Sequence, residues 1–139
     1  MIVTWLIWTV AVLVADQVTK GIVLRRFIEG ETSRLGLWIR LTRVTNRRAG
    51  WPQNRWAWLG LYAVGALGTA ALLDHGPISQ NGAVQASLGS ALGGATGNFL
   101  DRWRHHGVVD FIDLGFWPVF NLADIAIVVG TAIALLAMS

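Results

Sequence analysis

Four long apolar stretches restrict the fold of this 139-residue chain more than any other feature. They cover about residues 2–20, 56–73, 82–101 and 119–138. Each approaches the roughly 20 residues that an α-helix needs to cross the apolar core of a bilayer. Only 14% of the residues are charged, against roughly 25% in a soluble domain. The sequence therefore predicts an all-α integral membrane protein with four transmembrane helices.

The first and third stretches each carry one further indication. The first could be a secretory signal peptide, but no basic residue precedes it and "VADQVTK" after it is a poor cleavage site, so a retained helix is predicted. In the third stretch, Gly89, Gly93 and Gly97 repeat at four-residue spacing. They share one helical face, where another helix backbone can approach closely.

A basic segment over about residues 21–55 separates the first two stretches. Within it, Trp38 to Thr45 alternate in a pattern that weakly indicates a strand. A small sheet and an interfacial helix both fit this segment. We therefore expect a small β/amphipathic-helix insertion between the first two helices of a single membrane domain, residues 1–139.

Polar residues beside the last two apolar stretches are the candidate functional groups. A carboxylate near the centre of a membrane helix costs roughly 2.5–3.5 kcal/mol, so such residues usually face a protein interior and carry function. Asn121 and Asp124 lie three residues apart at the start of the last stretch, and Asn98 and Arg102 lie four apart at the end of the third. Asp110 lies between them on a short connection. We expect all five to meet at one membrane boundary.

Two neighbouring carboxylates suit peptide hydrolysis. Since both cannot ionise cheaply, the pair shares one proton. The ionised member can take a proton from water while the protonated member donates to the scissile carbonyl; the sequence leaves open which Asp is protonated. The chain has no Cys, which excludes thiol catalysis and thiolate ligands, and no metal site or cofactor is predicted. Asp113 is expected to be a solvated loop charge.

Four motifs together resemble the lipoprotein signal peptidase (signal peptidase II) family. They are "DQVTK" at 16–20, "GGATGNFLDR" at 93–102, "VVDFIDL" at 108–114 and "FNLADIAI" at 120–127. The resemblance implies a membrane aspartyl endopeptidase that removes the signal peptide of diacylglyceryl-modified prolipoproteins, cutting before the lipidated Cys. It implies catalysis by Asp110 and Asp124. Supporting or substrate-binding roles fall to Asn46, Asn98, Arg102 and Asn121, and structural roles to Asp16, Lys20 and Asp101.

One motif departs from the family pattern. Where the family usually has Asn-x-Gly-Ala-Ala-Phe, this chain has "NRRAGW" at 46–51. Asn46 is kept, but Arg48 stands at the Gly position and Trp51 at the Phe position. Since Gly permits backbone conformations that Arg disfavours, the backbone after Asn46 is expected to differ.

The expected partners are lipid-modified prolipoproteins and membrane lipids, with no nucleic acid, and the expected state is a monomer. The resemblance places the chain in the bacterial inner membrane as a multi-pass protein whose active site faces outward. All eleven Lys and Arg lie on that same side, which the positive-inside rule would make cytoplasmic; we give the motifs more weight. The alternative function is a small transporter or channel with Asp124 as an intramembrane proton- or ion-binding group.

Overall fold

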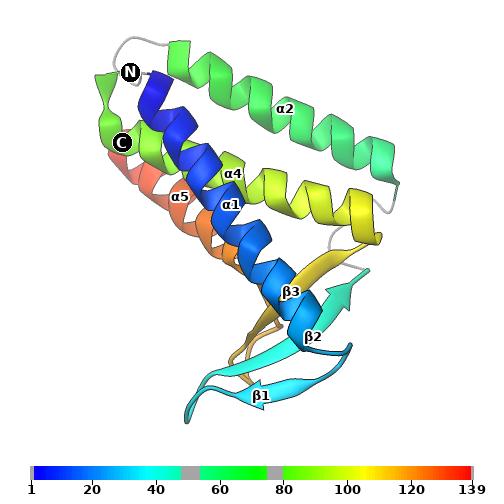
Figure 1. Cartoon of the computed structure of the whole chain (residues 1–139). Coiled ribbons are helices and arrows are strands. Elements are labelled where there is room, and N and C mark those ends of the chain that lie inside the picture. The colour runs from blue at the N-terminus through cyan, green and yellow to red at the C-terminus, as the bar shows by residue number, and fades with distance from the viewer. Residues whose placement is uncertain (1, 48–53, 75–79, 139) are drawn as a thin grey trace.

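The computed structural model describes residues 2–47, 54–74 and 80–138, and it combines a helix bundle with a small sheet (Figure 1). The helices are α1 (Ile2–Arg26), α2 (Arg55–Asp74), α4 (Gly82–His105) and α5 (Leu122–Met138). The strands are β1 (Thr32–Arg34), β2 (Arg40–Asn46) and β3 (Val108–Asp113). Both chain ends lie at one end of the bundle, and the sheet lies at the other.

Helix α4 is the centre of the bundle, because it contacts α1, α2 and α5. Its glycines allow the closest approaches. A Cβ at Gly93 would lie 2.5 Å from the Thr9 carbonyl oxygen of α1, and a Cβ at Gly94 would lie 2.5 Å from the Ala123 carbonyl oxygen of α5. Both distances are too short for a side chain, so these positions require Gly. A Cβ at Gly89 would likewise meet the Trp5 carbonyl oxygen of α1, so the predicted packing role is confirmed at Gly89 and Gly93.

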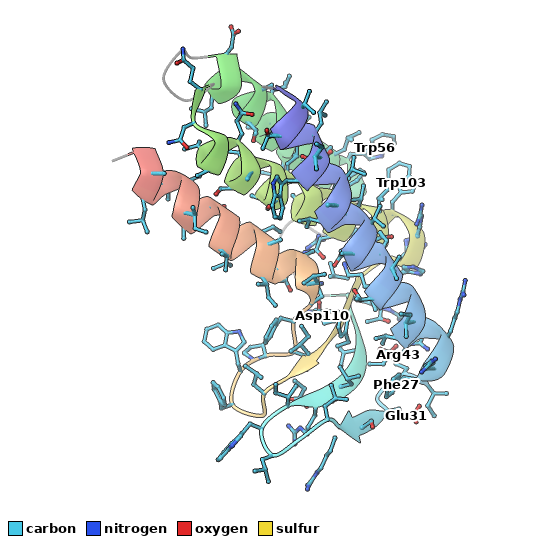
Figure 2. All side chains as sticks on the ribbon, turned by 60° about the vertical axis from the view of Figure 1, so that its left-hand side comes forward. Phe27, Glu31, Arg43, Trp56, Trp103 and Asp110 are labelled. Carbon is cyan, nitrogen blue, oxygen red and sulfur yellow. The ribbon has the colours of Figure 1, made fainter. Side chains whose placement is uncertain are left out.

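Helix α1 ends at Arg26, six residues beyond the predicted end at residue 20. The helix continues through Gly21, and a side chain from the sheet closes its end. The Arg43 guanidinium of β2 donates from Nη1 to the carbonyl oxygens of Leu24 (3.3 Å) and Phe27 (2.6 Å). Figure 2 shows Arg43 beside Phe27 and Glu31 at this end of α1. These bonds satisfy carbonyl groups that a helix end leaves without partners.

Helix α5 starts at Leu122, three residues later than predicted. The delay has a local cause, since Phe120 pairs with Ile112 in an isolated antiparallel bridge and its N–H donates to the Ile112 carbonyl oxygen at 3.0 Å. Asn121 then caps the helix, because its Oδ1 accepts from the Asp124 N–H at 2.9 Å. The first residues of the predicted stretch therefore belong to the sheet edge.

The sheet is antiparallel, in the order β1-β2-β3. Strand β2 matches the weak strand signal, and residues 27–47 hold strands rather than an interfacial helix. Strand β3 was not predicted, because its segment was expected to be a connection. It is buried on both faces except at Ile112, so it lacks the alternation that marks a half-exposed strand. Val44 of β2 lies opposite Asp110 of β3.

Side chains are distributed in the reverse of the soluble pattern. Large apolar groups are exposed along the helices, as at Val10 (56%), Val64 (70%) and Leu136 (76%), whereas Asp16 and Asn121 are fully buried. Among the described residues, Val3–Arg26 is the one helix both long and apolar enough to cross a membrane. Leu59–Leu72 and Leu122–Ala137 form shorter apolar helices. The fold is thus mostly helical, with an apolar exterior and a polar interior near the sheet.

Candidate active site

Asp124 occupies the third position of α5, where helix geometry fixes its carboxylate. It forms a reciprocal capping box with Asn121. The Asp124 N–H donates to Asn121 Oδ1 at 2.9 Å, and the Asn121 N–H donates to Asp124 Oδ2 at 3.2 Å. A negative charge in the first turn is also stabilised by the helix dipole. The same local sequence signal that starts the helix therefore orients this acid.

Asp110 comes from β3, and Figure 2 places it where the sheet meets the helices. Its side chain is buried and accepts two hydrogen bonds from amides. Asn121 Nδ2 donates to Oδ1 at 2.9 Å, and Asn46 Nδ2 donates to Oδ2 at 3.3 Å. Asn121 thus contacts both carboxylates, through its side chain to Asp110 and through its backbone to Asp124. This residue brings the strand acid and the helix acid to one place.

Asn98 of α4 supports the second acid. Its Nδ2 donates to Asp124 Oδ1 at 2.8 Å, and its Oδ1 accepts from Asn121 Nδ2 at 3.0 Å. Arg102, one turn later, is half-buried and donates from Nη1 to the Asn98 carbonyl oxygen at 3.2 Å. The spacing of four residues puts both on the face of α4 that points to the acids.

Burial and charge together set the protonation of Asp110. Removal from water raises the pKa of this carboxyl to about 7, and the nearby charge of Asp124 acts in the same direction. Hydrogen bonds from Asn46 and Asn121 and the charge of Lys20 lower the pKa, but by less. Near neutral pH, Asp110 is therefore close to half protonated. A carboxyl with a pKa near the working pH is suited to transfer protons in both directions.

A cavity of about 350 Å³ gives access to both acids. Its polar wall holds Asn46, Asn98, Arg102, Asp110 and Asp124, and its apolar wall comes from the segment before α5 and from α5 itself. A second cavity, of about 330 Å³, lies between α2, α4 and α5 and shares Asn98, Arg102 and Asp124. The two cavities therefore meet at Asp124, which gives the site one arm toward the sheet and one between the helices.

Three predicted structural residues form a buried ion cluster behind the acids. Lys20 Nζ lies 2.7 Å from Asp16 Oδ2 and 2.8 Å from Asp101 Oδ2. The two carboxylates also bind β3 and α5. Asp101 Oδ2 accepts from the Val109 N–H of β3 and Asp16 Oδ1 from the Ala123 N–H of α5, both at 3.0 Å. The cluster joins α1, α4, β3 and α5. The Asp16–Lys20 pair lies inside α1, and both side chains are buried.

The prediction for Asp113 was wrong. It belongs to β3 and pairs with β2, where Arg40 Nη2 lies 3.0 Å from both carboxylate oxygens and Thr42 Oγ1 donates at 2.9 Å. The hydrogen bond from Arg40 lowers the pKa of Asp113. The partner could not be seen in the sequence, because β3 was not recognised as a strand.

Gln17 was also missed as a connecting residue. Its Nε2 donates to Asp16, to Asp101 and to the Gly97 carbonyl oxygen, at 3.2, 3.2 and 3.3 Å. Its position inside the motif at 16–20 was the available signal. Arg48 and Trp51, where the chain departs from the family pattern, lie outside the described residues. Within residues 2–47, 54–74 and 80–138, no three His, Cys, Asp or Glu side chains group closely enough to hold a metal ion.

The chain is similar to one family of membrane peptidases along nearly its whole length. A family model described as signal peptidase (SPase) II matches residues 8–139. A lipoprotein signal peptidase of Syntrophomonas wolfei is 41% identical over 133 residues, which cover 90% of this chain and 85% of that protein. One of Burkholderia thailandensis is 37% identical over 143 residues, which cover 93% and 83%.

Two solved structures share the fold. Both are described as bacterial membrane enzymes determined by the in meso method, and they superpose with TM-scores of 0.86 and 0.84. The superpositions cover 97% of this chain and 87% and 92% of the two solved chains, at 24% identity. They place the arrangement of helices and sheet among bacterial membrane enzymes.

Proposed function

Because the chain belongs to the signal peptidase II family, we propose that Asp110 and Asp124 are the catalytic pair of an aspartyl endopeptidase. The activity of the chain is the removal of signal peptides from prolipoproteins. The observation that carries the proposal is the bridging of both carboxylates by Asn121 at one cavity. Nothing else in the described bundle combines two acids with access for a substrate.

The environments of the two acids assign their roles. We assign Asp124 as the general base, because it accepts hydrogen bonds from Asn98 Nδ2 and the Asn121 N–H at the start of a helix. Asp110 carries the shared proton, consistent with its pKa of about 7. In the first step Asp124 takes a proton from water as the oxygen attacks the scissile carbonyl, and Asp110 donates to the carbonyl oxygen. In the second, Asp124 gives this proton to the amide nitrogen, the C–N bond breaks, and Asp110 takes back its proton from the hydroxyl that it had protonated.

The other site residues bind and orient. Asn46 and Asn121 hold Asp110, and Asn98 holds Asp124. Arg102 lines both cavities, where its guanidinium can bind a backbone carbonyl of the substrate or the negative charge that develops on the attacked oxygen. The substrate is a diacylglyceryl-modified prolipoprotein, which is cut before its lipidated Cys. Its acyl chains need an apolar path, and the cavity between α2, α4 and α5 supports entry from the bilayer.

The chain forms one membrane domain in this proposal, with α1, α2, α4 and α5 as four spanning helices. The sheet, whose strands come between α1 and α2 and between α4 and α5 in the chain, lies on the extracytoplasmic side of the bacterial inner membrane and holds the site at the bilayer surface. The exposed apolar side chains of the helices support contact with lipid. The protein acts as a monomer in this scheme, because one chain supplies both acids.

Two substitutions test the catalytic pair. Asp110→Asn and Asp124→Asn are each expected to fold and to lose cleavage of a purified lipidated prolipoprotein by at least about a thousandfold, since the proton can no longer be shared. Asp113→Asn is the matched control, because it lies on the same strand as Asp110 but pairs with Arg40. It is expected to keep most of the activity. Substantial cleavage by both Asn variants of the pair would contradict the proposal.

A further inference from the structure

Lys20 is a buried cation that the proposed reaction does not use directly. Its side chain is 2% exposed, and its three N–H groups all have acceptors. Two are Asp16 and Asp101, and the third is Asn98 Oδ1 at 2.9 Å. The ion pairs with the two carboxylates do not require this third bond. It is directed at an amide that itself touches Asp124.

The ammonium decides which way the Asn98 amide faces. A Lys ammonium has three donors and no acceptor, so the amide must present its oxygen to Lys20. Its Nδ2 then points the other way and donates to Asp124 Oδ1 at 2.8 Å. A reversed amide would place an NH₂ group against the ammonium and an oxygen against the Asp124 carboxylate, and both contacts are repulsive.

The orientation passes from Asn98 to Asn121. Asn98 Oδ1 also accepts from Asn121 Nδ2 at 3.0 Å, and the same Nδ2 donates to Asp110 Oδ1 at 2.9 Å. The oxygen of Asn121 is held at the other end by the Asp124 backbone N–H at 2.9 Å. Two groups that can only donate, the Lys20 ammonium and this N–H, therefore fix both amides.

We propose that Lys20 is a positioning residue that orients Asn98 and, through it, Asn121, so that an N–H donor faces each acid of the catalytic pair. The inference rests on the proposed function, because it assigns Lys20 an effect on Asp110 and Asp124. A purely structural Lys20 would hold α1 against α4 and leave the acids unaffected. The two roles differ in what they predict for the dependence of the rate on pH.

Removal of Lys20 is expected to shift the pH dependence of the rate in one direction. The charged groups around the acids are Lys20 and Asp16 from α1 and Asp101 and Arg102 from α4, while β2 contributes the neutral Asn46. The charge of Lys20 lowers the pKa of Asp110 against the larger effect of burial. Without the ammonium and the donors it orients, ionisation of the pair becomes harder. The acid limb of the kcat/KM profile must then move to higher pH.

The main test is the double variant Lys20→Met with Asp101→Asn. It removes the ammonium but keeps the net charge of the cluster. The wild type has one cation and two carboxylates and the double variant has one carboxylate, so both carry one net negative charge. Asp16 remains held by the Ala123 N–H at the start of α5. The matched control is Asp101→Asn alone, which keeps Lys20 and its bond to Asn98. Unfolding temperatures in detergent and the kcat, KM and pH profile for a lipidated prolipoprotein are measured for both.

The double variant is expected to melt below the control, because buried Asp16 loses its cation, to lose about tenfold or more in kcat with little change in KM, and to show an acid limb at higher pH. The control keeps its limb in place or moves it to lower pH, since a negative charge is lost. A double variant with the kcat and the acid limb of the control would overturn the inference.

Lys20→Arg covers the case in which the double variant does not fold. It keeps the charge of the cluster but places its donors differently, so it is expected to fold and to show a lower kcat at unchanged KM; full kcat would overturn the inference. Asp110→Asn and Asp124→Asn are run alongside. If they remain active, the catalytic pair itself is wrong. If they are inactive while Lys20 can be removed without effect, only the role of Lys20 fails.

Discussion

Asn121 has the most connections among the side chains of the site. It caps α5, bridges the two acids and contacts Asn98, and it is fully buried. Such a residue makes the geometry of the pair depend on one amide. A small displacement of its backbone would change the distances to Asp110 and Asp124 at the same time.

The raised pKa of Asp110 predicts that this carboxyl lowers the free energy of unfolding at neutral pH. The carboxyl has a pKa of about 7 when folded and an ordinary value of 3.8 when unfolded. Between these values the folded state binds the proton more tightly, so stability falls as pH rises; the penalty is absent below 3.8 and complete above about 7. The full difference corresponds to about 4 kcal/mol. Asp110→Asn is therefore expected to melt above the wild type at about pH 8, with the gap closing toward pH 4.

Thermal unfolding in detergent across this pH range measures the effect. Asp113→Asn is the control with the opposite sign. The pKa of Asp113 is lowered by Arg40, so this carboxyl contributes stability above its unfolded pKa and loses that contribution as pH falls. Asp113→Asn should melt below the wild type at neutral pH. An Asp110→Asn variant that melts at or below the wild type at about pH 8 would show that the folded protein tolerates the charge.

At the residue scale, the sequence predicted which residues form the site better than it predicted their contact partners. Asp110, Asp124, Asn98, Asn121 and Arg102 stand out because carboxylates, amides and a guanidinium are rare beside such apolar stretches. The pairing of Asp113 could not be predicted, since its partners Thr42 and Arg40 lie 71 and 73 residues away in the sequence. The direction of each amide also depends on neighbours from other elements.

At the scale of elements, the helices were predictable and the sheet only partly. The apolar stretches gave all four helices, and the errors were confined to their ends. Helix α1 continued because Arg43, from a different element, closes it. Helix α5 started late because Phe120 is held by Ile112. Strand β3 was missed because a strand buried on both faces has no period that distinguishes it from other short apolar segments.

The contact of α4 with α1 gives a prediction for the element scale. Gly93→Ala puts a Cβ 2.5 Å from the Thr9 carbonyl oxygen, and a backbone atom cannot move aside without shifting α1. The expected loss is about 1–3 kcal/mol, seen as a lower unfolding temperature in detergent. Gly65→Ala in α2 is the matched control, because nothing lies within 4 Å of its Cβ. It should melt at or slightly above the wild type, and equal losses in both variants would contradict the packing role.

At the scale of the whole molecule, the sheet lies at one end of the bundle (Figure 1), and its strands carry Arg34, Arg40 and Arg43. The proposed orientation turns this end outward, whereas the positive-inside rule turns it toward the cytoplasm. In the sheet, Arg40 and Arg43 are held by ion pairs with Asp113 and Glu29. Attraction to anionic headgroups is available in either leaflet, so the charge alone does not determine the orientation.

Single-Cys labelling decides between the two orientations, and the absence of native Cys makes it direct. Ser33→Cys lies in exposed β1 at the sheet end, and Gln80→Cys is exposed before α4 at the opposite end. In spheroplasts, a membrane-impermeant maleimide is expected to label position 33 at once and position 80 only after permeabilisation. The reverse pattern would place the sheet in the cytoplasm.

The ion cluster of Lys20, Asp16 and Asp101 has a consequence for biosynthesis. It ties α1 to α4, β3 and α5, and the second acid arrives on the last of these helices to be translated. A chain synthesised only as far as β3 therefore holds Asp110 without Asp124. The proposed pair is complete only after α5 has been synthesised and has docked against α4.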